Sequence, residues 1–373
     1  MFRIHGFYLT ACCAVWFAQC GVVSAADEIV TIYPTYGYQD ENQWVIPVRL
    51  WVHERRRIAE TAAEKIITSM KDVSPEEIRN FRSRAADFLA DSESSELVIM
   101  AFDRDPLNQQ LQLTDSHGRT QKSDLNGLIE GTISLSRERA DSLLQSQQSH
   151  NGWLSVTVTS KGHTGTGRAR LIAPEGISVI SDIDDTIKVT EIPAGPEVVM
   201  RNTFLRDYKA APEMLTRYRE WSDAPFHYVS GGPWQMYRPL SEFLIDSKDG
   251  FPAGSFHMKS VQKNLFSKST WKDLTDLVTN SSQTFEHKVE QIALIMERFP
   301  RRQFVLVGDS GEKDPEVYSA IRAKFPEQVQ EIWIRDIVND RELNADRLSG
   351  MNVIPAVIVE RGTSEIVRDL VPK

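Results

Sequence analysis

Cysteine is nearly absent from this chain of 373 residues, and what there is lies close to the amino terminus. The three cysteines are Cys12, Cys13 and Cys20. They sit in a mostly apolar stretch that ends at Val23-Ser24-Ala25, and this arrangement is typical of a secretory signal peptide over residues 1–25. Without that segment the chain holds no cysteine, which excludes disulfides, thiolate nucleophiles and cysteine-ligated metals. We therefore expect a secreted or periplasmic protein, held at the membrane if the segment stays uncleaved.

The chain also lacks an excess of positive charge and any low-complexity tract. Its formal net charge is −9, with 41% hydrophobic and 25% charged residues, as in an ordinary globular protein. An acidic surface repels polyanions, so we expect no nucleic-acid partner. A phosphate-bearing ligand would need a local basic patch or a metal ion.

Residues 26–174 are predicted to form a mainly β domain. Short β-branched or alternating runs separated by turn residues predict strands at Ile29–Tyr33, Trp44–Val52, Leu97–Phe102, Leu128–Leu135, Trp153–Thr159 and Arg168–Ile172. Many short strands at this spacing are typical of a β-sandwich.

A helical hairpin is expected to interrupt these strands over residues 54–91. Apolar residues recur every four positions from Ile58 to Met70, as on one face of a helix. The sequence Ser74-Pro75-Glu76-Glu77 then offers an N-cap, a proline at the first helical position and a capping-box glutamate.

Residues 175–373 change to an alternation of strands and helices. The predicted strands are Ser178–Ser181, Phe226–Ser230, Gln303–Val307, Glu331–Arg335 and Val353–Val359, and the predicted helices are Pro212–Ser222, Trp234–Asp246, Phe285–Phe299 and Pro315–Lys324. Such alternation predicts an α/β domain, a doubly wound parallel sheet with helices on both faces.

Polar motifs stand where predicted strands end or a helix begins. Asp182-Ile-Asp184-Asp185-Thr186 follows the first strand, Ser230-Gly231 ends the second, Lys288 opens a helix, and Asp309 and Asp314 follow the third strand. The carboxyl ends of parallel strands meet at one crevice, so these groups should converge.

The converging groups suit phosphoryl transfer. A carboxylate can attack phosphorus, and a second acid can protonate the leaving oxygen and then activate water. Mg²⁺ prefers oxygen ligands, and a hydroxyl, backbone amides and a lysine can hold phosphate oxygens.

The motifs resemble those of the haloacid dehalogenase superfamily, which begin with Asp-x-Asp-x-Thr. The resemblance implies that Asp182 is the nucleophile and Asp184 the general acid and base. The resemblance also implies that Ser230, Gly231 and Lys288 bind the phosphoryl group. It implies that Mg²⁺ is held by Asp182, Asp309 and the backbone carbonyl of Asp184. Three further residues are implied to support the site, namely Thr186, Asp185 and Asp314.

A closer resemblance links the chain to the actin patch protein family of phosphatidate phosphatases. It rests on three stretches, namely residues 174–188, Tyr228-Val-Ser-Gly-Gly-Pro-Trp234 and Val307-Gly-Asp-Ser-Gly-Glu-Lys-Asp314. The family implies Mg²⁺-dependent removal of phosphate from phosphatidate, giving diacylglycerol. Its known activity comes chiefly from intracellular members, so the signal peptide is a departure that bears on the substrate.

Residues 250–272 reverse the overall charge. They carry four lysines, no acid and several apolar residues, which predicts peripheral contact with an anionic lipid surface; solvated loop lysines are the alternative. Two other functions remain open: a phosphatase for soluble esters or phosphoproteins, and an idle phosphatase fold that binds envelope lipid or glycan.

Overall fold

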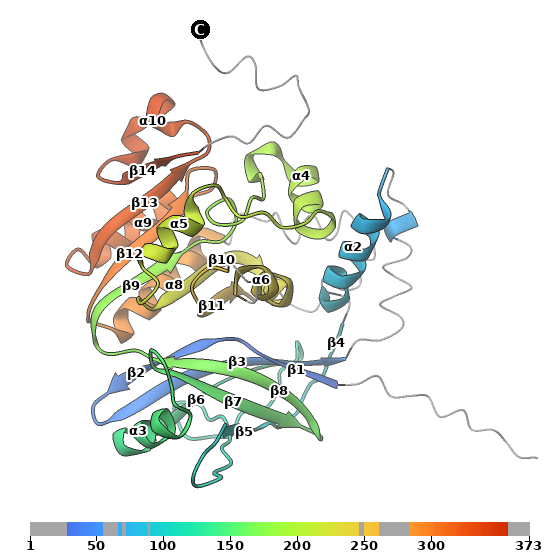
Figure 1. Cartoon of the computed structure of the whole chain (residues 1–373), viewed down its shortest axis with the longest axis vertical. Helices are drawn as coiled ribbons and strands as arrows, with labels where there is room; N and C mark the ends of the chain where they lie inside the picture. Colours follow the sequence, from blue (N-terminus) through green and yellow to red (C-terminus); the bar gives the residue numbers. More distant parts are fainter. Residues whose placement is uncertain are drawn as a thin grey trace, which may run out of the picture.

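The computed structural model describes residues 28–54, 66–68, 72–88, 90–245, 250–260 and 284–356. The predicted signal peptide therefore lies outside the described residues. Within them the chain forms two sheets, one mainly antiparallel and one parallel (Figure 1). A mixed α/β architecture is thus confirmed.

The first sheet has eight strands, and five of the six predicted N-terminal strands match it closely. Its members are β1 (Glu28–Ile32), β2 (Thr35–Asp40), β3 (Gln43–Glu54), β4 (Asp91–Ser92), β5 (Ile99–Phe102), β6 (Leu128–Ser136), β7 (Trp153–Ser160) and β8 (His163–Leu171), with helix α3 (Arg137–Ser146). Strand β2 links two groups of strands, because its residues 38–40 pair with β3 and its residues 35–37 pair with β8, and the expected β-sandwich stays a prediction.

Strand β2 was not predicted from sequence, because Gly37 interrupts its pattern. A Cβ at this position would lie 2.6 Å from Leu171 Cδ2, so the glycine permits close packing against β8. Alternate residues of the sheet bury a core of aliphatic side chains from Val30 to Leu171.

Helix α2 (Pro75–Phe88) confirms the second helix of the predicted hairpin. Its capping box forms as expected: Glu77 N–H donates to Ser74 Oγ over 3.2 Å, and Ser74 N–H donates to Glu77 Oε2 over 2.9 Å. Of the first predicted helix, only residues 66–68 are described, and they are helical.

The parallel sheet has six strands: β9 (Glu175–Ser181), β10 (Phe226–Pro233), β11 (Gly254–Lys259), β12 (Arg301–Asp309), β13 (Val329–Asp336) and β14 (Asn352–Pro355). Their order is β11-β10-β9-β12-β13-β14, so the direction of strand addition reverses between β9 and β12. Ligands of open α/β sheets bind at such a reversal. It brings the ends of two predicted motifs, at Asp182 and Asp309, side by side.

Helices pack on both faces of this sheet. Alternate residues of β9 separate the faces: Val179 packs with one core and Ile180 with the other. The first face is covered by α4 (Pro196–Met200), the π-helix η2 (Arg201–Leu205), α5 (Met214–Glu220), the short turn η3 (Trp234–Met236) and α6 (Tyr237–Leu244). The second is covered by α8 (Thr284–Arg298) and α9 (Asp314–Lys324).

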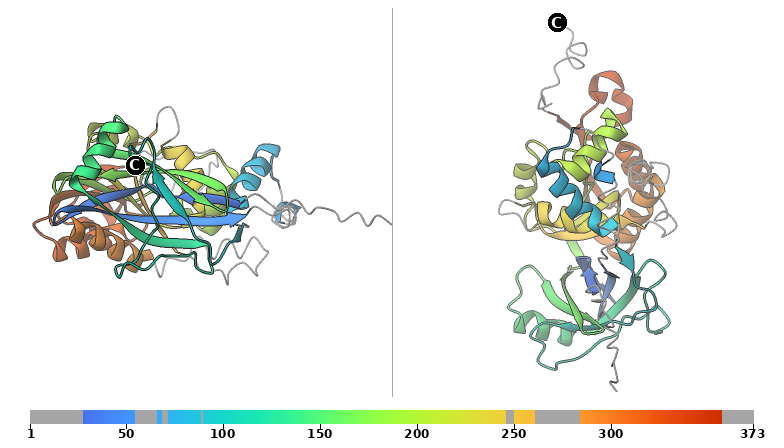
Figure 2. Two further views of the ribbon diagram at one scale, coloured as in Figure 1. Left: turned by 90° about the horizontal axis from the view of Figure 1, so that it is seen from below. Right: turned by 90° about the vertical axis from the view of Figure 1, so that its right-hand side faces the viewer.

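The two sheets are packed together and not merely tethered (Figure 2). Tyr33 and Trp51 of the first sheet share a core with Tyr228 and Trp234 of the α/β part. Buried arginines reinforce the contact; Arg170 donates to the carbonyls of Asp223 and Ala224.

Helix α10 (Asp340–Leu343) and the turn η5 (Ala345–Leu348) precede the last strand.

The structure corrects part of the expected lipid contact through residues 250–272. Phe251, Phe256 and Met258 are buried, because residues 254–259 form β11 at the edge of the parallel sheet. These side chains are unavailable to a lipid surface. Lys263, Lys268 and Lys272 lie outside the described residues.

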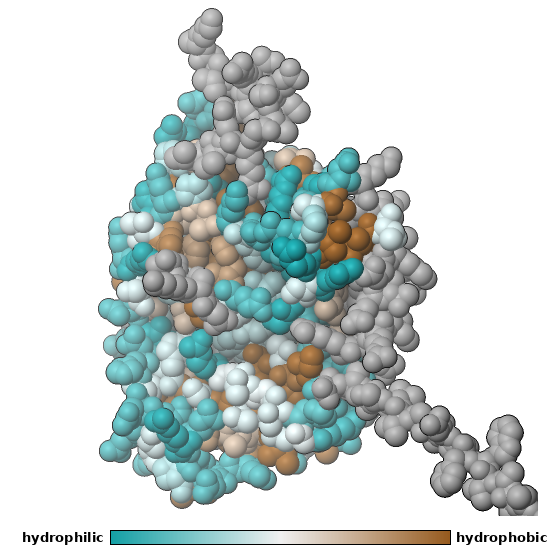
Figure 3. All heavy atoms as spheres, turned by 45° about the vertical axis from the view of Figure 1, so that its right-hand side comes forward, coloured by the Kyte–Doolittle hydropathy of each residue, from teal (hydrophilic) through white to brown (hydrophobic). Residues whose placement is uncertain are grey.

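On the face drawn in Figure 3, hydrophobic side chains appear as separate patches among hydrophilic ones. Among the helices of the described residues, none is long and apolar enough to cross a membrane.

Candidate active site

The loop after β9 holds Asp182 at the centre of the site. Asp182 is 1% exposed, and its backbone N–H donates to Val307 O of the neighbouring strand over 2.9 Å. Thr186 Oγ1 donates to Asp182 Oδ2 over 3.1 Å, which orients the carboxylate. The structure thus brings the predicted nucleophile and its supporting threonine together.

Asp185 closes this loop. Its φ of 56° lies in the left-handed region, which aspartate tolerates better than most residues. Its carboxylate accepts backbone N–H groups from residues 190, 191 and 192 at 2.6–2.8 Å, and its carbonyl accepts from Arg335 Nη1. Asp185 therefore shapes the loop, and its supporting role in the reaction stays a prediction.

Lys288 joins the motifs. Its Nζ lies 2.8 Å from Asp182 Oδ1, 2.6 Å from Asp314 Oδ1 and 3.4 Å from Glu312 Oε2. Burial acts to lower the pKa of Lys288, but these three acids outweigh it and raise that pKa well above the usual value. The lysine is therefore held as a cation. Gly308 allows the packing, since a Cβ there would lie 2.5 Å from Asp314 Oδ2.

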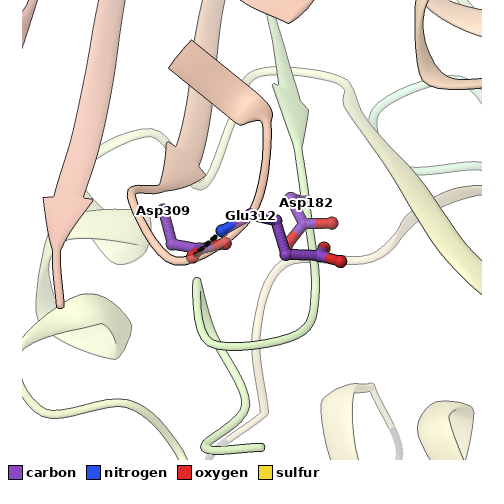
Figure 4. Close-up of side chains that lie close together, drawn as sticks. All are labelled: Asp182, Asp309 and Glu312. Atoms are coloured by element: carbon purple, nitrogen blue, oxygen red, sulfur yellow. Dashed lines mark hydrogen bonds between the residues drawn. The ribbon is translucent and has the colours of Figure 1, made fainter. Parts of the chain in front are cut away.

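Three acids face one another beside Lys288. Oxygen atoms of Asp182, Asp309 and Glu312 lie within 4.8 Å of one another (Figure 4). Asp309 Oδ1 accepts N–H groups from Gly311 and Glu312, whereas Asp309 Oδ2 is buried without a hydrogen-bond partner among the residues that the structure describes. Such an open carboxylate oxygen fits a metal ligand.

Electrostatics also favours a cation here. Burial raises the pKa of Asp182 and Asp309 well above the usual value, and neighbouring carboxylates raise it further. Burial likewise raises the pKa of Glu312. A divalent cation would hold all three in the ionised form. Sequence reasoning missed Glu312, although the residue stands between the two predicted acids of its motif.

The Asp184 side chain contacts Lys188 and Thr190 and does not join the three clustered acids. Its Oδ1 lies 2.7 Å from Lys188 Nζ and accepts from Thr190 Oγ1 over 2.6 Å. Burial alone would raise the pKa of Asp184, but the ion pair with Lys188 and the hydrogen bonds outweigh it and lower that pKa. The side chain is not one of the three clustered acids. Lys188 was also missed; its place four residues after Asp184 was the available signal.

The expected phosphate-binding residues end β10. Ser230 is buried, and its Oγ accepts from Gly232 N–H over 2.9 Å. At Gly231 a Cβ would lie 2.5 Å from Thr284 Cγ2, so the glycine lets the strand end approach the start of α8. Gly231 and Gly232 line the pocket, whereas Ser230 does not.

A pocket of about 410 Å³ lies beside the site, and Asp182 and Asp309 are not among its lining residues. Asp184, Lys188, Lys288, Glu312 and Asp314 line its polar end. Its apolar side is formed by Pro196 and Val199 of α4 and by Met236 and Leu240 of η3 and α6, and Ile192 and Val317 are further apolar lining residues. A ligand with a charged end and an apolar body matches this division.

Comparison with known proteins agrees with the motifs. Residues 177–336 match the family described as "Phosphatidate phosphatase APP1, catalytic domain". The chain is 34% identical over 191 residues to "Phosphatidate phosphatase APP1" of Saccharomyces cerevisiae, which covers 49% of this chain and 30% of the yeast protein. An uncharacterised protein of Schizosaccharomyces pombe is 30% identical to this chain over 173 residues. The match covers 44% of this chain and 26% of the S. pombe protein.

The chain thus spans less than a third of the length of these relatives. Among solved structures, the match to a carbohydrate acetylesterase from Xanthomonas citri covers 83% of this chain and 69% of the esterase chain. Its sequence identity is 10% and the TM-score is 0.23, which is too low to indicate a shared fold.

Proposed function

We propose that this chain, whose residues 177–336 match the family described as "Phosphatidate phosphatase APP1, catalytic domain", hydrolyses a phosphate monoester carried by a lipid, with phosphatidate as the leading substrate. The observation that carries the proposal is the contact of Lys288 with both Asp182 and Asp314 at the polar end of a half-apolar pocket. A phosphate fits the polar end and a glycerol with acyl chains fits the apolar side.

In the proposed reaction Asp182 attacks phosphorus and the ester P–O bond breaks. The products of this step are an aspartyl-phosphate and the lipid alcohol, whose oxygen takes a proton from Asp184. Water then attacks the aspartyl-phosphate, gives its proton to Asp184, and releases phosphate with Asp182 regenerated. Thr186 keeps the attacking carboxylate oriented through its hydrogen bond.

The environment of Asp184 supports the second of its two roles more directly. Its lowered pKa favours the ionised form, which can take a proton from water. For the first role the carboxyl must carry a proton, so it has to separate from Lys188. The substrate phosphate, an anion entering between the two, provides a competing partner for this lysine.

Mg²⁺ fits the acid cluster, and Asp182, Asp309 and Glu312 are the residues that would hold it. When bound, it would offset the negative charge of the phosphoryl group and of the crowded carboxylates. Lys288 provides fixed positive charge for the same phosphoryl oxygens.

We also infer a doubly wound fold of haloacid dehalogenase type over residues 175–356. The strand order, with its reversal beside Asp182, supports this, as does the packing of helices on both faces. The mainly β part is proposed as a domain of its own over residues 26–174. Export through residues 1–25 stays a proposal, and cell fractionation would test it.

A substrate screen tests the function. The chain should release phosphate from dioctanoyl phosphatidate with Mg²⁺ and not with EDTA. Leu240→Asn, which places an amide on the apolar side, should raise KM for this lipid about tenfold and leave p-nitrophenyl phosphate hydrolysis within about twofold. Equal effects on both esters would favour a soluble substrate, and no release from any ester would overturn the proposal.

A further inference from the structure

Helix α2 precedes the family-matched residues 177–336, yet it packs against the apolar side of the pocket. In Figures 1 and 2 it lies beside α4 and α6 of the α/β part, away from the eight-stranded sheet. The α4–η2 segment contributes Val199 and Thr203 to the pocket, and the η3–α6 segment contributes Met236 and Leu240. One inserted helix therefore touches both elements that form this side.

The first contact joins α2 to the end of the π-helix. Arg84, which is 9% exposed, donates from Nη1 to the carbonyls of Thr203 and Arg206 over 3.1 Å and 2.6 Å. Asn80 Nδ2 donates to Leu205 O over 2.8 Å. The last carbonyls of a helix have no partner within it, so α2 supplies the missing donors. Phe81 and Phe88 add ring contacts to the buried Phe204.

The second contact joins α2 to α6. Asp87 is 3% exposed and pairs with Arg238, whose Nε lies 2.7 Å from Asp87 Oδ2. Arg238 Nη2 also donates to Ser83 O over 2.5 Å. Arg238 stands between the pocket residues Met236 and Leu240 in sequence. The ion pair therefore ties the start of α6 to the same helix that holds η2.

A third relationship leads to the reacting groups. The guanidinium of Arg84 lies 4.0 Å from the centre of the Tyr208 ring, and Lys188 Nζ lies 5.0 Å from it. Tyr208 Oη donates to Thr203 O over 3.0 Å, so the ring is fixed to the pocket wall. Lys188 in turn pairs with Asp184. Two residues, Tyr208 and Lys188, thus separate Arg84 from the proposed acid and base.

We propose that helix α2 is a working part of the active site, in which Arg84 and Asp87 act as positioning residues that set the shape of the lipid-binding side of the pocket. Neither residue lines the pocket, so each acts through the element that it holds. The proposal rests on the proposed function for its substrate and adds an element from outside the family-matched segment to the site. A π-helix at this point agrees with it, since such irregular turns are frequent at functional sites.

The test compares the variants Arg84→Ala, Arg84→Lys and Asp87→Asn with Arg79→Ala, an exposed arginine on the same helix. Arg84→Ala and Asp87→Asn should raise KM for dioctanoyl phosphatidate about tenfold, because pocket walls that shift slightly bind poorly. Hydrolysis of p-nitrophenyl phosphate, which does not reach the apolar side, should change less than about threefold. Arg84→Lys should restore part of the lipid KM, and Arg79→Ala should match the original chain.

Hydrogen exchange supplies a readout that needs no activity. Amides of residues 196–208 and 234–244 should exchange faster in Arg84→Ala and Asp87→Asn, respectively, while β7 and β8 keep their protection. If Arg84→Ala fails to fold, Arg84→Lys and Asp87→Asn carry the test. Unchanged lipid KM and unchanged exchange would overturn the proposal. If the original chain hydrolyses no ester, the proposed function fails and the exchange rates alone decide this inference.

Discussion

Lys288 Nζ lies 2.8 Å from Asp182 Oδ1, and the two side chains are only 2% and 1% exposed. The lysine also meets Asp314 at 2.6 Å, so one buried cation serves two buried carboxylates. Such a charge is costly to bury alone, and each partner depends on the other to stay ionised. Several properties of the protein should follow from this contact.

Removal of the lysine charge should destabilise the metal-free protein. Lys288→Met leaves Asp182 and Asp314 without their buried cation, and we expect a loss of about 3–5 kcal/mol in the free energy of unfolding. Urea titration measures it, and Mg²⁺ should recover part of the loss. Lys324→Met, which breaks an exposed pair with Glu297, should cost less than about 1 kcal/mol. Equal losses in the two variants would contradict a special role for the buried contact.

Asp182→Asn should abolish turnover without unfolding the chain. The amide has the shape of the carboxylate but cannot attack phosphorus, so phosphate release should fall by at least about a thousandfold. The amide oxygen can still accept from Thr186, but Lys288 loses one of its two close carboxylates, so the thermal midpoint should fall while the chain stays folded by circular dichroism. Asp141→Asn on the surface of α3 is the control. Substantial residual release by Asp182→Asn would exclude this residue as nucleophile.

Glu312→Gln should weaken metal binding and spare the fold. Glu312 is one of the three clustered acids, so its loss should lower the Mg²⁺ affinity about tenfold or more. A ligand that binds the folded state raises its stability, so the thermal midpoint of the original chain should rise with Mg²⁺ and that of the variant should rise less. The exposed Glu327→Gln should respond like the original chain. Identical midpoint shifts would remove Glu312 from the metal site.

Acid should destabilise the protein through histidines that lie between the two sheets. His227 and His257 flank the hydroxyl of Ser255 at 2.8 Å and 2.9 Å and pack around Tyr36. Burial lowers the pKa of His227 well below its usual value and that of His257 to about 3. Because the unfolded chain binds protons first, stability should be complete above about pH 6.5 and fall as the pH drops toward 3.

His257→Gln should flatten this dependence. Urea midpoints between pH 7 and pH 4.5 should fall less steeply in the variant than in the original chain, because one proton fewer is taken up on unfolding. The exposed His117→Gln serves as the comparison. A variant with an unchanged slope would show that His257 is not protonated on unfolding in this range.

Much of the site could be predicted because its residues are tied to local signals. Short apolar runs predict β9, β10 and β12; Asp182 follows β9, Ser230 lies in the second half of β10, and Asp309 ends β12. Parallel strands share a carboxyl edge, so the local pattern alone indicated that these groups converge. The capping box at Ser74 likewise placed the start of α2.

The features that could not be predicted depend instead on contacts between distant parts of the chain. Strand β2 depends on a glycine packed against Leu171, and β11 is hidden in a stretch whose lysines suggest a surface loop. Glu312 and Lys188 were visible in the sequence, but the direction of a side chain from a loop depends on hydrogen bonds that span the fold. The contact between Asp185 and Arg335 is one of these.

The sequence by itself determined which chemical groups gather at the carboxyl edge of the parallel sheet, because a few residue types at strand ends are enough to specify carboxylates, a lysine and a crevice. Only the tertiary structure decided which carboxylates lie together, which way Asp184 points, and that a helix from the first part of the chain packs against elements that line the pocket. The physical reason is the sequence distance over which each kind of interaction acts. Strand and helix signals act within a few residues, whereas the contact of Arg84 with Thr203 joins segments more than a hundred residues apart and exists only once both are packed.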